Sequence, residues 1–267
     1  MMNKPIIIPF IELIKRSWSN VLLNNEYIIK MVFIPALILA GVALLSPNPF
    51  ITLLFSGIFA SFVSVYWCRK IILNEDISKD NLRIREVWNY ICKYILFIII
   101  FLAPAIIIVM ILATLNYASI KASENANEIY ALAFVATIIT SFFCVRLRMS
   151  LAATAIDDKE LGFKLAFALT KGNTARLFFA LIAIILPVSI ASQFWATLYG
   201  FFESNILLVG IWNIVFYGLN MITAAFYASY DAHGYHYFTY FYHKAIEEGE
   251  AIEAGKLVED EIKARRD

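Results

Sequence analysis

Charged residues are scarce in this chain of 267 residues, where Asp, Glu, Lys and Arg together make up 16% of the sequence. A typical soluble domain has about 25%. Long stretches contain no charge at all, which excludes an ordinary water-exposed surface along them. Cysteine is also rare: Cys68, Cys92 and Cys144 show no metal-ligand spacing, and a disulfide framework is not expected.

Sequence motifs of catalysis are missing as well. The chain has no nucleophile elbow, no His-Glu-x-x-His pair, no Walker sequence and no Cys-x-x-Cys pair. Without a positioned acid, base or nucleophile, the sequence does not predict an enzyme. No catalytic residue, metal, cofactor or nucleic-acid partner is expected.

Long apolar stretches are what the chain has instead. Hydrophobic residues make up 61% of it, and the mean hydropathy is +0.73. About 18 or more apolar residues can cross the hydrocarbon core of a membrane as one helix. The runs are continuous and do not alternate, which favours helices over a β-barrel. We therefore predict an all-α integral membrane protein with spans at about 28–45, 50–68, 91–115, 129–146, 177–199 and 206–230.

The distribution of positive charge predicts the orientation of these spans. All but one of the 22 lysine and arginine residues lie in or next to four segments, and the exception is Lys121. The four segments are the N-terminal region, the stretches 69–93 and 146–176, and the C-terminal tail. Positive residues favour the cytoplasmic side. Both termini are therefore expected in the cytoplasm, with the six spans arranged as three hairpins.

Three regions follow from this layout: residues 1–27 as an amphipathic interfacial segment, 28–230 as the six-span membrane domain, and 231–267 as a charged cytoplasmic helix or tail. Residues 10–22 alternate apolar and polar side chains at helical spacing, and 160–170 repeat the pattern more briefly. Such helices lie in the membrane surface, where basic residues meet anionic headgroups.

The hairpins also show a repeating pattern. Each of three units has an interfacial segment, a span that contains a proline (Pro35, Pro104 or Pro187), and a returning span. Each unit crosses twice, so the copies would share one orientation. We predict a threefold parallel repeat about an axis along the membrane normal, unlike the inverted repeats of many transporters.

Two groups of polar residues are candidate sites. The densest cluster is a candidate lipid-headgroup site, in which Arg supplies paired donors and Lys a point charge; its residues are Arg146, Arg148, Asp157, Lys171 and Asn173. The alternative is ordinary topology, with arginines that snorkel at a span end and a helix cap at 172–173. A polar cavity lined by Gln193, Asn213 and Asn220 is the second candidate, although amides also join helices in membranes.

A third group is rich in histidine and tyrosine. His233 and His236 are three residues apart, close to Asp231 and followed by His243. Gly234 is expected to interrupt the helix that would bring them together. We therefore interpret the run as an aromatic belt at the membrane surface and not as a metal site.

The stretch Arg146–Phe178, RLRMSLAATAIDDKELGFKLAFALTKGNTARLF, resembles the bacterial YciC-like membrane proteins and the related membrane domain of glycerophosphoryl diester phosphodiesterases. The resemblance matches Arg146 or Arg148 to the arginine of a span end, Asp157 to a loop acid, and residues 170–173 to a turn. Ala168 departs from the family, in which such helices often have Ser before an aromatic residue. No phosphodiesterase domain follows residue 230, so that activity is not expected. The resemblance implies a multi-span protein of the bacterial inner membrane, tied to envelope or lipid homeostasis.

The leading functional hypothesis is a non-enzymatic membrane protein that binds lipids or a protein partner through its cytoplasmic face or C-terminal tail. The alternative is a transporter or channel for a lipid or small amphiphile, because proline-bearing spans around an axis can shape a cavity. A membrane enzyme ranks last. It would require Asp157, Asp231, His233 and His236 to converge.

Overall fold

The computed structural model describes residues 7–46, 48–75, 83–116, 126–203 and 205–247, and every regular element in this part of the chain is a helix. The helices are α1 (Phe10–Leu23), α2 (Asn25–Leu45), α3 (Pro49–Leu73), α4 (Ile84–Asn116), α5 (Ala126–Cys144), α6 (Met149–Ala155), α7 (Phe163–Leu169), α8 (Thr174–Thr197) and α9 (Ile206–Glu247), with short 3-10 turns at Val145–Leu147 and Leu198–Phe201.

Five of the described helices are long and apolar enough to cross a membrane: α2, α3, the first part of α4, α8 with its following turn, and α9. A sixth candidate is a bent pair, Val135–Leu147 followed by Met149–Ala155, whose two parts meet at 45°. The all-α class is confirmed. Of the six predicted spans, five are matched by such helices, and the sixth is matched only if the bent pair counts as one span. The protein is therefore a membrane protein with several spans.

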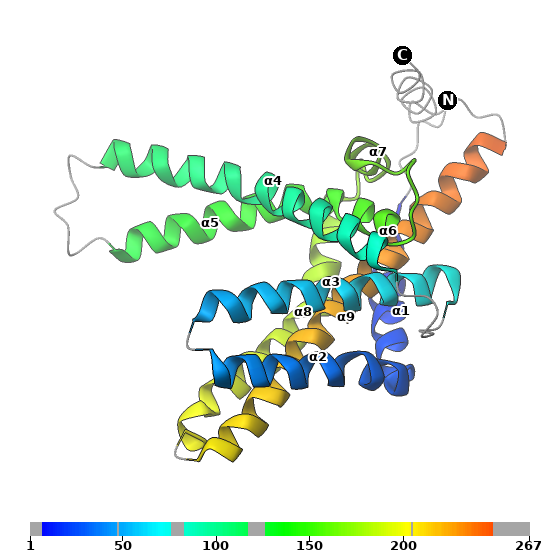
Figure 1. Ribbon diagram of the computed structural model, residues 1–267. Helices are drawn as coiled ribbons and strands as arrows, with labels where there is room; N and C mark the ends of the chain where they lie inside the picture. Colours follow the sequence, from blue (N-terminus) through cyan, green and yellow to red (C-terminus); the bar gives the residue numbers. More distant parts are fainter. Residues whose placement is uncertain (1–6, 47, 76–82, 117–125, 204, 248–267) are drawn as a thin grey trace.

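Three helix pairs follow one another along the chain: α2 with α3, α4 with α5, and α8 with α9 (Figure 1). The α4–α5 pair extends away from the others, whereas α9 contacts α1, α2, α3, α6 and α8. Helix α1 runs across the direction of α2 and α3. The threefold repeat and the position of α1 and α7 at a membrane surface stay predictions.

The start of α3 is explained by its local sequence. Asn48 precedes α3, and its side-chain oxygen accepts a hydrogen bond from the amide of Phe50 at 3.0 Å. Pro49 occupies the first turn, where the missing N–H costs nothing and its fixed φ suits a helix. Local sequence therefore determines where α3 begins. Residues 117–125, between α4 and α5, and the tail beyond Glu247 lie outside the described residues.

The expectation that Gly234 interrupts the last helix is wrong, because α9 continues without a break to Glu247. A glycine costs a helix only about 1 kcal/mol relative to alanine, and tertiary packing outweighs that. Here the packing partner is Met149 of α6. A Cβ atom at position 234 would lie 2.3 Å from the Met149 sulfur, so the missing side chain makes room for α6.

We expect Gly234→Leu to lower the unfolding free energy by about 1–3 kcal/mol, the cost of overfilling a packed contact. Thermal unfolding in detergent measures the change. Adding Met149→Ala should restore part of the loss by opening space. Gly41→Leu is the control, since no atom lies within 4 Å of its Cβ position. Equal losses at positions 41 and 234 would contradict this account.

Candidate functional site

A buried ion pair joins α6 to α9. The guanidinium of Arg148 donates from Nε to Oδ1 and from Nη2 to Oδ2 of Asp231, both at 2.8 Å. Arg148 is 7% exposed and Asp231 1% exposed. The ring of Tyr227 lies 4.5 Å from the guanidinium carbon, and that of Phe97 5.8 Å. Both charges are thus satisfied inside the protein, and Arg148 does not face a lipid headgroup.

The other residues of the predicted headgroup cluster lie in different surroundings. Arg146 donates to Thr170 Oγ1 at 3.2 Å and to the Phe167 carbonyl, and it covers the ring of Phe167. Asn173 is buried, whereas Lys171 is exposed. The turn between them contains Gly172 at φ 81°, a conformation that favours glycine. Residues 170–173 therefore form a folded connection between α7 and α8 that Arg146 contacts, and Lys171 is exposed on its surface.

Asp157 belongs to a separate charged region near the ends of α3, α4 and α6. Arg85 donates to its carboxylate at 2.9 Å. Close by, buried Arg69 donates to both oxygens of Glu75, at 2.7 and 2.9 Å, and to the Ala155 carbonyl at 3.2 Å. These hydrogen bonds, together with the positive charges of Arg69 and Arg83, hold the pKa of Glu75 below its ordinary value although burial opposes them.

The segment before α1 is fastened to α8 and α9. The amide of Ile8 donates to Asn173 Oδ1 at 3.0 Å, and the Tyr237 hydroxyl donates to the Ile7 carbonyl at 2.7 Å. Arg176 approaches the Ile8 carbonyl at 3.5 Å. Asn173 therefore holds the N-terminal segment against the start of α8.

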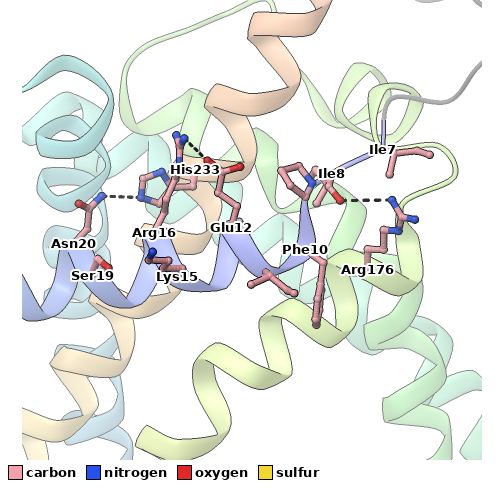
Figure 2. Close-up of a pocket in the computed structure, with 12 residues that line it drawn as sticks. Ile7, Ile8, Phe10, Glu12, Lys15, Arg16, Ser19, Asn20, Arg176 and His233 are labelled. Atoms are coloured by element: carbon pink, nitrogen blue, oxygen red, sulfur yellow. Dashed lines mark hydrogen bonds and ion pairs between the residues drawn. The ribbon is translucent and has the colours of Figure 1, made fainter.

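This anchored segment forms one wall of a hollow of about 1090 Å³ (Figure 2). Its lining comes from the N-terminal segment, α1, α8 and α9, and includes three exposed cations, Lys15, Arg16 and Arg176. Glu12 is the one carboxylate of the lining, and it is paired with Arg16. Lys15 and Arg176 have no ion-pair partner in the described part of the chain. The hollow therefore carries an excess of positive charge.

A smaller hollow of about 280 Å³ lies beside the first and shares Glu12, Arg16 and His233 with it. Its remaining lining is mostly aromatic, with Tyr237, Tyr240 and Phe241 from the end of α9. His233 is fixed by a contact of 2.7 Å between its Nε2 and the side-chain nitrogen of Asn20. The tyrosine-rich run thus packs along α1, while His236 and His243 are exposed.

The residues predicted to line a polar cavity do not line either of these two hollows. Gln193 is exposed, Asn213 is buried, and the Asn220 amide donates to the Phe216 carbonyl of its own helix at 3.1 Å. Near Gln193 and Asn213, Trp195 and Trp212 exchange hydrogen bonds from their indole nitrogens to each other's carbonyls, at 3.2 and 3.0 Å. Those bonds join α8 to α9.

Sequence reasoning missed the partner of Arg148 and the contribution of Arg176. Asp231 is the first acidic residue after a long uncharged run, and an ionisable group next to such a run requires a partner. The sequence therefore indicates that Asp231 has a partner, although it does not identify which arginine forms the ion pair. Nothing in the sequence brings Arg176 to Ile8, because 168 positions separate them.

Among the described residues, no three His, Cys, Asp or Glu side chains are placed to hold a metal ion. Comparisons of the chain with protein-family models, with curated proteins and with solved structures found no match. The resemblance to YciC-like proteins therefore stays a prediction from the quoted residues.

We expect Arg148→Met to cost about 3–5 kcal/mol of unfolding free energy, because it leaves Asp231 charged and buried without a partner. Unfolding in mixed micelles with increasing denaturing detergent measures the loss. The double variant Arg148→Met with Asp231→Leu should recover most of it, since neither charge remains. A double variant as unstable as the single one would show that the pair itself is not the cause.

Acid should weaken the contact between Arg69 and Glu75. The lowered pKa of Glu75 means that its charged form stabilises the fold fully above the unfolded value, about 4.3. This contribution is lost as pH falls through the lower folded pKa. Glu75→Gln should therefore melt earlier than the native protein at pH 7 and show a smaller further decline below pH 4. Melting curves from pH 7 to pH 3 test this, with the exposed Glu203→Gln as control; equal declines would contradict it.

Proposed function

We propose that this chain is a non-enzymatic multi-span protein of the bacterial inner membrane that binds anionic phospholipid in the larger hollow. One observation carries the proposal: Lys15, Arg16 and Arg176 surround a single hollow of about 1090 Å³ that contains one carboxylate. Anionic lipids of the cytoplasmic leaflet attract basic segments beside membrane helices. Arginine and lysine bind phosphate through charge-assisted hydrogen bonds.

The character of α1 supports this proposal. Its buried face, with Leu13, Ser17 and Val21, packs on α8 and α9. Ile11 and Leu23 are 77% and 79% exposed on the same helix that carries exposed Lys15 and Arg16. A helix with exposed apolar and basic side chains side by side suits the boundary between acyl chains and headgroups. We propose that α1 lies there, on the cytoplasmic side where positive residues gather.

The larger hollow replaces the 146–173 cluster as the preferred lipid site. Arg148 and Asn173 are engaged inside the protein, and Arg146 and Asp157 have partners of their own. Asn173 does not line the hollow but positions its wall, because its side chain accepts a hydrogen bond from the Ile8 amide. A role in envelope or lipid homeostasis, which the YciC-like resemblance implies, agrees with a lipid-binding surface.

The alternative function, a transporter or channel, has less support. It relied on a polar cavity at Gln193, Asn213 and Asn220, and these residues line neither hollow. A protein partner on the C-terminal tail would bind residues that lie largely outside the described part of the chain.

We expect Lys15→Gln with Arg16→Gln to weaken binding of phosphatidylglycerol by roughly 30-fold, since each basic residue near a lipid surface contributes about 1 kcal/mol. Native mass spectrometry of the detergent-solubilised protein, titrated with this lipid, measures the change. Lys30→Gln removes one exposed charge outside the hollow and should leave binding unchanged. Lys171→Gln tests the 146–173 cluster directly. If Lys171→Gln lowered the affinity for phosphatidylglycerol more than the double variant does, the lipid would bind at the 146–173 cluster and not in the larger hollow.

A further inference from the structure

The positive charges of the larger hollow are divided between two ends. Arg176, from α8, lies at one end beside Ile8, and Lys15 and Arg16, from α1, lie at the other with Asn20 and His233 (Figure 2). Ile8, Phe10 and Glu12 occupy the region between them. The hollow thus offers two cationic ends separated by a floor that is apolar except for Glu12.

Helix geometry sets the scale of this separation. The six steps from Phe10 to Arg16 rise roughly 9 Å along α1. Arg176 is held at the near end, because its Nη1 atom lies 3.5 Å from the Ile8 carbonyl. Lys15 and Arg176 therefore lie toward opposite ends of the hollow, and two anionic groups, one at each end, can engage both.

Each end of the larger hollow carries a net charge of about +1. At the α1 end, Glu12 pairs with Arg16 and offsets it, so Lys15 supplies the excess. At the α8 end, Arg176 has no carboxylate partner among the described residues. Two ends of about +1 each match a ligand with two phosphodiesters, each of which carries one negative charge.

Resting on the proposed function, we infer that the preferred ligand is a phospholipid with two phosphatidyl groups joined by a short polyol, the chemical class of cardiolipin. One phosphate lies against Arg176 and the other against Lys15 and Arg16. The bridge crosses the floor at Ile8 and Phe10, and exposed Ile7 and Ile11 border the acyl chains. Basic pockets between membrane helices are known to take such headgroups. Joining two phosphates in one molecule also makes the second contact intramolecular and strengthens binding.

Counting bound lipids by native mass spectrometry tests this inference on the full chain in detergent. Titration with cardiolipin should give one tightly bound molecule, whereas phosphatidylglycerol should give up to two, each bound at least about tenfold more weakly. Phosphatidylcholine serves as the background for bulk lipid. Deacylated cardiolipin, which keeps both phosphates without the chains, should compete poorly; equal competition would point to a soluble bis-phosphate in place of a lipid.

Single-charge variants separate the two ends. Lys15→Gln and Arg176→Gln should each lower the affinity for cardiolipin to about that for phosphatidylglycerol and reduce bound phosphatidylglycerol from two molecules to one. Lys30→Gln should change neither. Equal affinity of the native protein for both anionic lipids, or two bound cardiolipins, would overturn the two-phosphate inference and leave the proposed function standing. Binding of no anionic lipid above the phosphatidylcholine background would overturn both.

Discussion

The bond between Arg148 and Asp231 is the interaction on which the rest of the structure depends. Removing two charges from water is expensive, and only close, paired geometry such as these two 2.8 Å contacts offsets the cost. Apolar helices in lipid have little directional preference for one another. The ion pair determines how α6 sits on α9, because it fixes this short helix at one position along α9, just after the 45° bend. Gly234, three residues further along α9, accepts Met149, the neighbour of Arg148.

The hollow follows from the same central helix. Helices α1 and α8 both pack on α9, and the segment before α1 is tied to them through Asn173 and Tyr237. Its cationic side chains therefore come from separate parts of the sequence and meet because α9 lies beneath them. Ile8 and Asn173, which position the wall of the hollow, are buried and hydrogen-bonded to each other, whereas Lys15 and Arg176 are exposed.

The helical class, five of the long apolar helices and their succession in pairs could be predicted from sequence, because hydropathy is a local property that directly governs partition into lipid. The Asn48-Pro49 start of α3 was equally local. The partner of Arg148 lies 83 positions away, and composition does not encode such a pairing. The polar residues at 146–173 were predicted to form an exposed lipid site. Sequence cannot show that Arg148 is paired with buried Asp231, or that Asn173 accepts a hydrogen bond from the Ile8 amide. Continuity through Gly234 was missed since it depends on the Met149 contact.

The position of α9 in the chain has a consequence for biogenesis. A ribosome makes α1, α2, α3, α6 and α8 before the helix that all of them contact. During that interval Arg148 has been synthesised without Asp231, so an unpaired cation must remain in water or at the headgroup level. The earlier helices also contact one another, as α1 and α8 do and as α4 and α6 do, but their contacts with α9 form only once the last helix has been made. A nascent chain that ends before Asp231 therefore lacks both the partner of Arg148 and the helix that joins α1, α2, α3, α6 and α8.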